Sequence, residues 1–140
     1  MAYRKDLKSA ARRHLKAAQV LYGEAGPGGQ PGCRAVAGYL FGMAGELALK
    51  EIMRDSGILP LPTAERRGDP HYAHFPKLKL MLTTTTGRRA GDLRQFSEDP
   101  KLFQNWNTDM RYAPTDDVEE NWVRAWKATA EKLVEKMAVG

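Results

Sequence analysis

Cysteine is almost absent from this 140-residue sequence, since Cys33 is the only one. A single cysteine excludes an intrachain disulfide and a zinc site built from several cysteines. We interpret Cys33 as a small apolar residue at the start of a helix rather than as a reactive thiol.

Long hydrophobic runs are also missing. The longest nearly apolar stretch, residues 35–45, is about half the length needed to cross a bilayer, and Glu46 and Lys50 follow it. Residues 1–6 lead into a charged segment without the apolar core of a secretory signal. We therefore expect no membrane-spanning helix and a cytoplasmic protein.

Histidine is scarce, with only His14, His71 and His74 in the chain. No acidic ligand pattern surrounds them, so we expect neither a metal site nor a cofactor. His14 stands near the apolar stripe of the first predicted helix and is interpreted as a histidine at the edge of the core. The sequence also contains no phosphate-binding glycine loop, nucleophile elbow or zinc-protease motif.

Positive charge is in modest excess. The chain has 22 Lys and Arg against 17 Asp and Glu, for a net charge of +5. This excess suits a polyanionic partner without requiring one. A basic stripe repeats every four residues on the first predicted helix, with Lys5 and Arg13 beside it; its members are Arg4, Lys8, Arg12 and Lys16. Both a solvated helix face and a nucleic-acid surface fit this stripe.

The spacing of apolar residues predicts an all-α fold in one domain, residues 1–140, as an up-and-down bundle of four to five helices. We expect helices over 3–22 and 34–55, a third from residue 75, a shorter one over 88–96 and a helical turn over 100–106. Asp116 or Asp117 is expected to cap the last helix. Glycine and proline mark loops over 23–33 and 56–73. The alternation over 77–80 also fits a strand, but a lone strand would have no partner.

Three glycines interrupt the second predicted helix, at Gly38, Gly42 and Gly45. Each costs up to ~1 kcal/mol relative to Ala in an exposed helix, so they predict close packing of another helix. One apolar face is expected on the last helix, formed by Val118, Trp122, Ala125, Trp126, Thr129, Leu133, Val134 and Met137.

Glu46 and Lys50 stand one turn apart at the predicted edge of the core. An acid four residues before a base is the favourable orientation for a helical ion pair. A buried Glu46 would need a cation, because an isolated buried carboxylate is very costly. Arg111 is the candidate partner from elsewhere in the chain.

Four segments together resemble the HEPN domains, a family named for its occurrence in higher eukaryotes and prokaryotes and for nucleotide binding. The segments are ARRHLKAA at 11–18, GELALK at 45–50, His74 followed by Leu78, and DMRYAP at 109–114. The resemblance covers nearly the whole chain. It implies a helical bundle that dimerises, and a prokaryotic toxin-antitoxin, defence or stress setting beside a nucleotidyltransferase or antitoxin partner.

The resemblance also implies how an active member would work. Such members resemble metal-independent ribonucleases that use an arginine followed four to six residues later by a histidine. In this sequence Arg111 is followed by Tyr112, and no histidine occurs after His74. We therefore expect a binding and dimerisation module for a nucleotide, RNA or protein partner, with a polar cluster of Arg111, Tyr112, Glu46 and Lys50.

A second hypothesis is an endoribonuclease toxin acting at a dimer cleft. Four residues separate Arg66 from His71, and six separate Arg67 from His74, so the family's spacing also occurs in this loop. A histidine there would act as general base on a ribose hydroxyl, and an arginine would stabilise the phosphorane charge.

Overall fold

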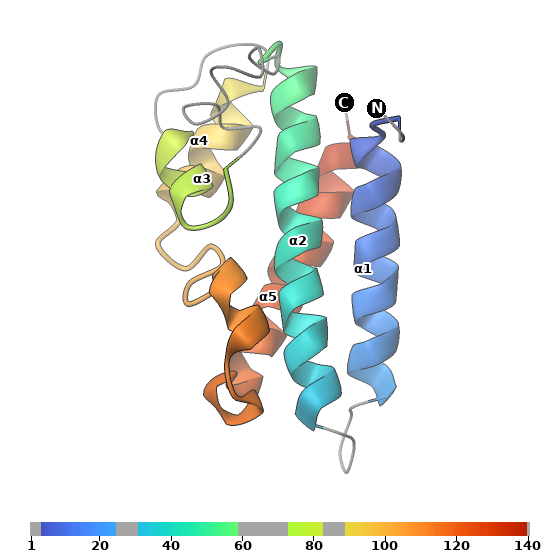
Figure 1. Ribbon diagram of the computed structural model, residues 1–140. Helices are drawn as coiled ribbons and strands as arrows, with labels where there is room; N and C mark the ends of the chain where they lie inside the picture. The colour runs from blue at the N-terminus through green and yellow to red at the C-terminus, as the bar shows by residue number, and fades with distance from the viewer. Residues whose placement is uncertain (1–3, 25–30, 59–72, 83–88, 140) are drawn as a thin grey trace.

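The structure is a computed structural model that describes residues 4–24, 31–58, 73–82 and 89–139. Within these ranges the chain is helical and contains no strand (Figure 1). The elements in order are α1 (Leu7–Glu24), α2 (Pro31–Asp55), α3 (Lys77–Met81), α4 (Ala90–Glu98), the 3-10 helices η3 (Thr108–Tyr112) and η4 (Thr115–Asp117), and α5 (Glu120–Ala138). The expectation of an all-α bundle is confirmed.

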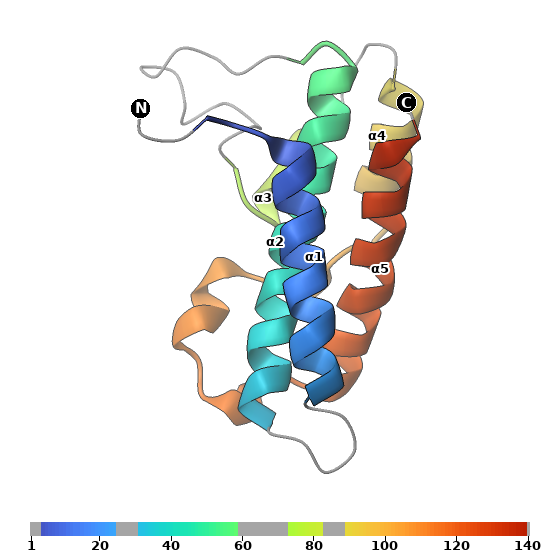
Figure 2. The ribbon, with the colours of Figure 1, turned by 90° about the vertical axis from the view of Figure 1, so that its right-hand side faces the viewer.

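The three long helices form the bundle, with α2 packed against both α1 and α5 (Figures 1 and 2). Helix α1 is antiparallel to α2, and α5 is antiparallel to α1 and parallel to α2. The short helices α3 and α4 lie beside the upper half of α2 in Figure 1, and the segment with η3 and η4 lies beside its lower half. Helix α2 is therefore the central element, in contact with every layer.

Local sequence explains where α1 and α2 begin. The carboxylate of Asp6 accepts hydrogen bonds from the backbone N–H of Ser9 at 3.0 Å and from its hydroxyl at 2.8 Å, so Asp6 caps α1. Helix α2 begins at Pro31, because proline is tolerated in the first helical position, where no N–H is needed. The predicted loop over 23–33 was thus too long, since Gly23 and residues 31–33 are helical.

Two of the three α2 glycines that were predicted to mark close packing accept aromatic rings from a non-helical segment. A Cβ at Gly42 would overlap the indole of Trp106, and one at Gly45 would lie 2.5 Å from Cε2 of Phe103. Gly38 faces helix α5, because a Cβ there would lie 2.9 Å from Cγ2 of Val123, and a Cβ at Gly45 would also contact Leu133 of α5 at 3.5 Å. The glycines mark close packing as predicted: a helix is the neighbour at Gly38 and, together with Phe103, at Gly45, whereas Gly42 accepts the indole of the non-helical Trp106.

The turn over residues 100–106 places the rings of Phe103 and Trp106 in the core. It is not the helical turn that was predicted, because Phe103 and Asn105 adopt positive φ angles of 48° and 71°. Those conformations are unfavourable for residues with a Cβ. Burial of Phe103 and Trp106, each 2% exposed, offsets that cost, since a large side chain contributes ~1.5–3 kcal/mol when fully buried.

The start of the last helix was predicted incorrectly. Asp116 and Asp117 lie in η4, and α5 begins only at Glu120, with Glu119 in the capping position. The buried face of α5 is also shifted from the prediction: Ala125 is exposed, whereas Val123 and Ala130 are buried. The face comprises Val123, Trp126, Ala130, Leu133, Val134 and Met137. The predicted set thus combined residues of the buried face with residues beside it, such as the half-buried Trp122 and the exposed Ala125.

Arg89 ties three helices together near the end of the bundle. Its guanidinium, 6% exposed, donates to the backbone oxygen of Lys136 on α5 at 2.9 Å and lies 3.3 Å from carboxylate oxygens of Asp55 and Asp92. Its backbone N–H donates to the hydroxyl of Ser56 at 2.9 Å.

No helix among the described residues is both long and apolar enough to span a membrane.

Candidate functional site

The buried carboxylate of Glu46 organises one side of α2. Its Oε2 lies 2.8 Å from Nδ1 of His74, and its Oε1 accepts a hydrogen bond from the backbone N–H of Phe75 at 2.7 Å. Glu46 is 1% exposed, whereas the side chain of His74 is 50% exposed. An imidazole that donates from Nδ1 to this carboxylate leaves Nε2 as its second, outward nitrogen for another partner.

The prediction that Arg111 pairs with Glu46 is wrong. Arg111 lies in η3, is exposed, and donates from Nε to the backbone oxygen of Thr108 at 2.9 Å. Its guanidinium carbon lies 5.8 Å from the ring centroid of Tyr39 and 5.1 Å from that of Tyr112. The arginine is therefore held among aromatic rings at the surface, while a histidine supplies the partner of the buried acid.

We call the group formed by the exposed Arg111 and Tyr112 and the half-buried Tyr39 the Arg111-Tyr112 surface. Tyr112 is 79% exposed, an unusual position for a large aromatic side chain. Asn107 starts η3 by accepting a hydrogen bond from the backbone N–H of Asp109 at 2.9 Å, which holds the turn that carries Arg111 and Tyr112. The aromatic and cationic groups of this surface are thus presented by a defined backbone.

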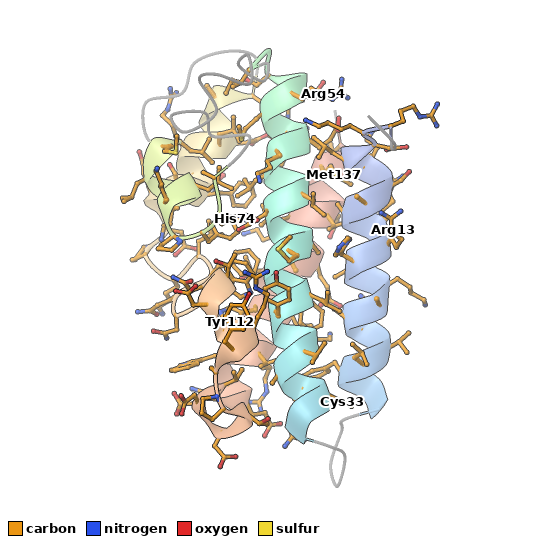
Figure 3. The ribbon with its side chains drawn as sticks, in the orientation of Figure 1. Arg13, Cys33, Arg54, His74, Tyr112 and Met137 are labelled. Carbon is orange, nitrogen blue, oxygen red and sulfur yellow. The ribbon has the colours of Figure 1, made fainter. Side chains whose placement is uncertain are left out.

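A series of ring contacts connects the Arg111-Tyr112 surface to His74. Tyr39 stacks on Trp106 at 5.7 Å, Trp106 meets Phe75 edge-on at 6.1 Å, and Phe75 follows His74 in the chain. Figure 3 shows His74 and Tyr112 on the same side of α2. The two polar groups therefore belong to one side of the molecule, joined through buried rings rather than through an ion pair.

Lys50, the fourth member of the predicted polar cluster, lies about three helical turns along α2 from Tyr39, which Arg111 contacts. It is 8% exposed and lines a groove between α1 and the C-terminal half of α2. The predicted cluster thus separates into Glu46, the Arg111-Tyr112 surface, and Lys50 in the groove.

The residues proposed from the loop spacing are only partly within the described ranges. Arg66, Arg67 and His71 lie outside them, and His74 is the one member that the structure places. Its bond to Glu46 was not expected from the sequence.

The basic stripe of the first helix is divided in the structure. Helix α1 begins at Leu7, so Arg4 precedes it rather than continuing the stripe. Arg4 and Lys8 line the groove between α1 and α2, whereas Arg12 and Lys16 are exposed elsewhere on α1. His14, whose Nδ1 lies 2.8 Å from the backbone oxygen of Ala10, is half-buried as expected.

Sequence reasoning missed two residues of this side of the molecule. These are Tyr39, on α2, and Trp106, at the end of the turn over 100–106. Gly42 was the available signal for Trp106, since the indole fills the space of the missing side chain. The indole Nε1 of Trp106 donates to the backbone oxygen of Gly38 at 3.2 Å. Trp106 is therefore a buried structural residue and not a ligand-binding ring.

Chemically, this side of α2 offers an imidazole oriented by a buried acid and an exposed guanidinium between tyrosine rings. The first arrangement suits proton transfer or a structural anchor, and the second suits stacking on planar groups. No group of three or more metal-ligating side chains occurs within the described part of the chain.

Comparison with protein-family models, with curated proteins and with solved structures finds no match to this chain.

Proposed function

We propose that this protein is a HEPN-like binding module that engages single-stranded RNA or nucleotides through the Arg111-Tyr112 surface. The observation that carries the proposal is the guanidinium of Arg111, 5.1 Å from the ring centroid of a tyrosine that is 79% exposed. Aromatic rings and arginine planes stack on unpaired bases, and the arginine also attracts the phosphate backbone.

The setting of the proposal follows from the four segments that resemble HEPN domains. We place the protein in the cytoplasm, as a homodimer in a toxin-antitoxin or defence system with a nucleotidyltransferase or antitoxin partner. The all-α bundle is compatible with this assignment. Sedimentation velocity tests the dimer: a monomer at all concentrations would remove that part of the proposal.

Fluorescence anisotropy with a labelled single-stranded RNA oligomer tests the binding surface. Tyr112→Ala should raise Kd by about 5- to 150-fold, because stacking on a base contributes roughly 1–3 kcal/mol. Tyr112→Phe should keep most of the affinity, since the ring remains. Arg124→Ala removes another exposed arginine, on α5, and should change Kd by less than about twofold.

Two results would oppose the proposal. One is an unchanged Kd in Tyr112→Ala and Arg111→Ala. The other is an equal loss of affinity in Arg124→Ala, because this would assign RNA binding to overall charge instead of to the Arg111-Tyr112 surface.

A metal-independent endoribonuclease is the second candidate, and the Glu46–His74 pair favours it. A buried carboxylate that accepts from Nδ1 leaves Nε2 of an exposed imidazole to take a proton from a ribose hydroxyl, as a general base does. Chelator-resistant cleavage of total RNA, lost in both His74→Ala and Glu46→Gln, would support this function. Intact RNA after prolonged incubation would argue against it.

A further inference from the structure

The solvent-accessible face of α2 is apolar along most of the helix. Between Val36 and Met53 only five side chains of α2 are not buried, and none of them is charged; they are Val36, Tyr39, Leu40, Met43 and Leu47. Four of these follow one another at intervals of three or four residues, which brings them to one side of the helix. We call this row, formed by Val36, Leu40, Met43 and Leu47, the α2 apolar stripe.

The other sides of α2 are occupied by the rest of the bundle. Helix α1 lies on one side of it, the η3 segment lies on the other side, and α5 packs behind it (Figure 1). Val36 is 51% exposed, and the remaining residues of the stripe are half-buried. Single exposed apolar residues are ordinary, whereas a helix that is apolar all round is normally covered on all sides. The stripe is therefore a candidate contact surface for another molecule.

The stripe ends in a groove that carries positive charge. Leu47 lines this groove, which has a volume of about 710 Å³ and lies between the N-terminal part of α1 and the C-terminal half of α2. Lys8 and Arg13 line it from α1; both are exposed, and neither forms an ion pair with a described residue. Figure 3 shows Arg13 on α1 and Arg54 near the end of α2. One end of the apolar surface is thus bordered by cations.

Both acids that line the groove are already engaged. Asp6 accepts hydrogen bonds from the backbone and the hydroxyl of Ser9. Glu51, 5% exposed, accepts from the guanidinium of Arg54. A molecule that covers the stripe and reaches the groove therefore gains affinity from carboxylates at that end.

We propose that the α2 apolar stripe and the adjoining groove bind an amphipathic α-helix of a partner protein, with acidic side chains beside Lys8 and Arg13. The stripe is about three helical turns long, and the apolar face of one helix packs into the groove formed by others. Charge argues against a second copy of this chain as the occupant, because the matching stripe of that copy contains no acid. Binding at this stripe does not require RNA binding at the Arg111-Tyr112 surface.

Fluorescence anisotropy of the full chain with two labelled synthetic peptides tests the proposal. The first peptide is a helix of about 15 residues with leucines along one face and glutamates in the turn that meets the groove. The second peptide has lysine in place of each glutamate. The glutamate peptide should bind, and the lysine peptide should bind about tenfold more weakly or less, because like charges then meet Lys8 and Arg13. Absence of binding, or equal binding of both peptides, would overturn the proposal.

The apolar contact is tested by Val36→Glu, with Val20→Glu as the matched control. Val20 is 53% exposed and lies on the side of α1 opposite the buried Ala11 and Ala18. Val36→Glu should raise Kd for the glutamate peptide by about tenfold or more, because it places a charge in an apolar contact. Val20→Glu should change this Kd by less than about twofold. Both valines are exposed, so circular dichroism should show intact helices, and equal losses of affinity would count against the stripe.

The charged contact is tested by Lys8→Glu, with Lys16→Glu as the control. Lys16 is exposed on the same helix, about two turns away and outside the groove. Lys8→Glu should weaken binding of the glutamate peptide by about tenfold and strengthen binding of the lysine peptide. Lys16→Glu should change either Kd by less than about twofold at physiological ionic strength. Equal effects of the two variants would assign binding to net charge and would overturn the proposal.

Sedimentation velocity distinguishes a partner helix from a second copy of the chain. Val36→Glu should leave the oligomeric state of the full chain unchanged, since no second copy occupies the stripe. A dimer that becomes a monomer in Val36→Glu would place a second copy on the stripe and would overturn the proposal.

Discussion

His74 and Glu46 form a bond of 2.8 Å between an exposed imidazole and a carboxylate that is 1% exposed. The bond joins residue 74, just before α3, to the middle of α2, and the backbone N–H of Phe75 supplies the second contact of the same carboxylate. One buried acid thus attaches the start of the α3 segment to the central helix.

The first prediction compares His74→Ala with Arg111→Ala. Removing His74 leaves the buried carboxylate with one fewer hydrogen bond, so the free energy of unfolding should fall by roughly 1–3 kcal/mol. Removing Arg111 deletes its contacts with Tyr39 and Tyr112 and one exposed hydrogen bond to the backbone oxygen of Thr108, and should cost less than about 1 kcal/mol. Urea denaturation followed by circular dichroism measures both. A larger loss in Arg111→Ala than in His74→Ala would contradict the arrangement described here.

The second prediction concerns Gly42. A methyl group at this position overlaps the indole of Trp106, so Gly42→Ala should destabilise the protein by about 1–3 kcal/mol despite the better helix propensity of alanine. Gly91→Ala is the matched control, because Gly91 lies in α4 with nothing within 4 Å of the added carbon. It should be stabilising by up to about 1 kcal/mol. Opposite signs in thermal denaturation are expected; the same sign for both would show that the indole moves aside freely.

The third prediction concerns Arg89. Arg89→Met keeps much of the side-chain volume but removes the donors to Asp55, Asp92 and the backbone of Lys136. The free energy of unfolding should fall by roughly 1–3 kcal/mol, because polar groups of three helices lose a shared partner. Arg124→Met on the exposed face of α5 should change it by less than about 0.5 kcal/mol. Equal stability of the two variants in urea would show that Arg89 is not a tie between helices.

The fourth prediction is a dependence on pH through the cap of α1. Hydrogen bonds from Ser9 lower the pKa of Asp6 in the folded protein below its ordinary value of 3.8. A carboxyl with a lowered folded-state pKa contributes stability above its unfolded pKa and loses that contribution as pH falls through the folded value. The difference in unfolding free energy between the wild type and Asp6→Ala should therefore be constant above pH 3.8 and shrink below it.

The control for this measurement is Asp109→Ala, which removes an exposed acid that caps no helix through its side chain. Its unfolding free energy should follow that of the wild type as the pH is lowered. If the difference in unfolding free energy between the wild type and Asp6→Ala instead increased as the pH is lowered, the prediction would be contradicted.

The sequence predicts the long helices well because their apolar residues repeat with helical spacing and their ends carry glycine, proline or aspartate. It also predicts that Glu46 needs a partner once it is buried. The identity of that partner was not predictable, because the argument from charge alone favours a permanent cation such as Arg111 over a histidine. In the structure, hydrogen bonds from a backbone N–H and an imidazole satisfy the same carboxylate, and no arginine or lysine takes part in them.

The segment over 100–119 was predicted least well. Positive φ angles at Phe103 and Asn105 are set by tertiary burial of the rings and leave no local signal in residues that carry a Cβ. The 3-10 helices that follow are too short for periodicity to reveal. The position of the Arg111-Tyr112 surface depends on this segment. The sequence therefore shows which side chains form the surface but not where in the fold they lie.

The indole of Trp106 lies directly against the backbone of α2 at Gly42. If α2 rotated about its axis or slid along it, the neighbouring Phe41 or Met43 would be driven into that ring. The indole therefore limits both the rotation of α2 about its axis and its position along that axis. Since α2 also carries Tyr39 and Glu46, this ring, together with Phe103 at Gly45, fixes where the Arg111-Tyr112 surface and the Glu46–His74 pair lie on the helix.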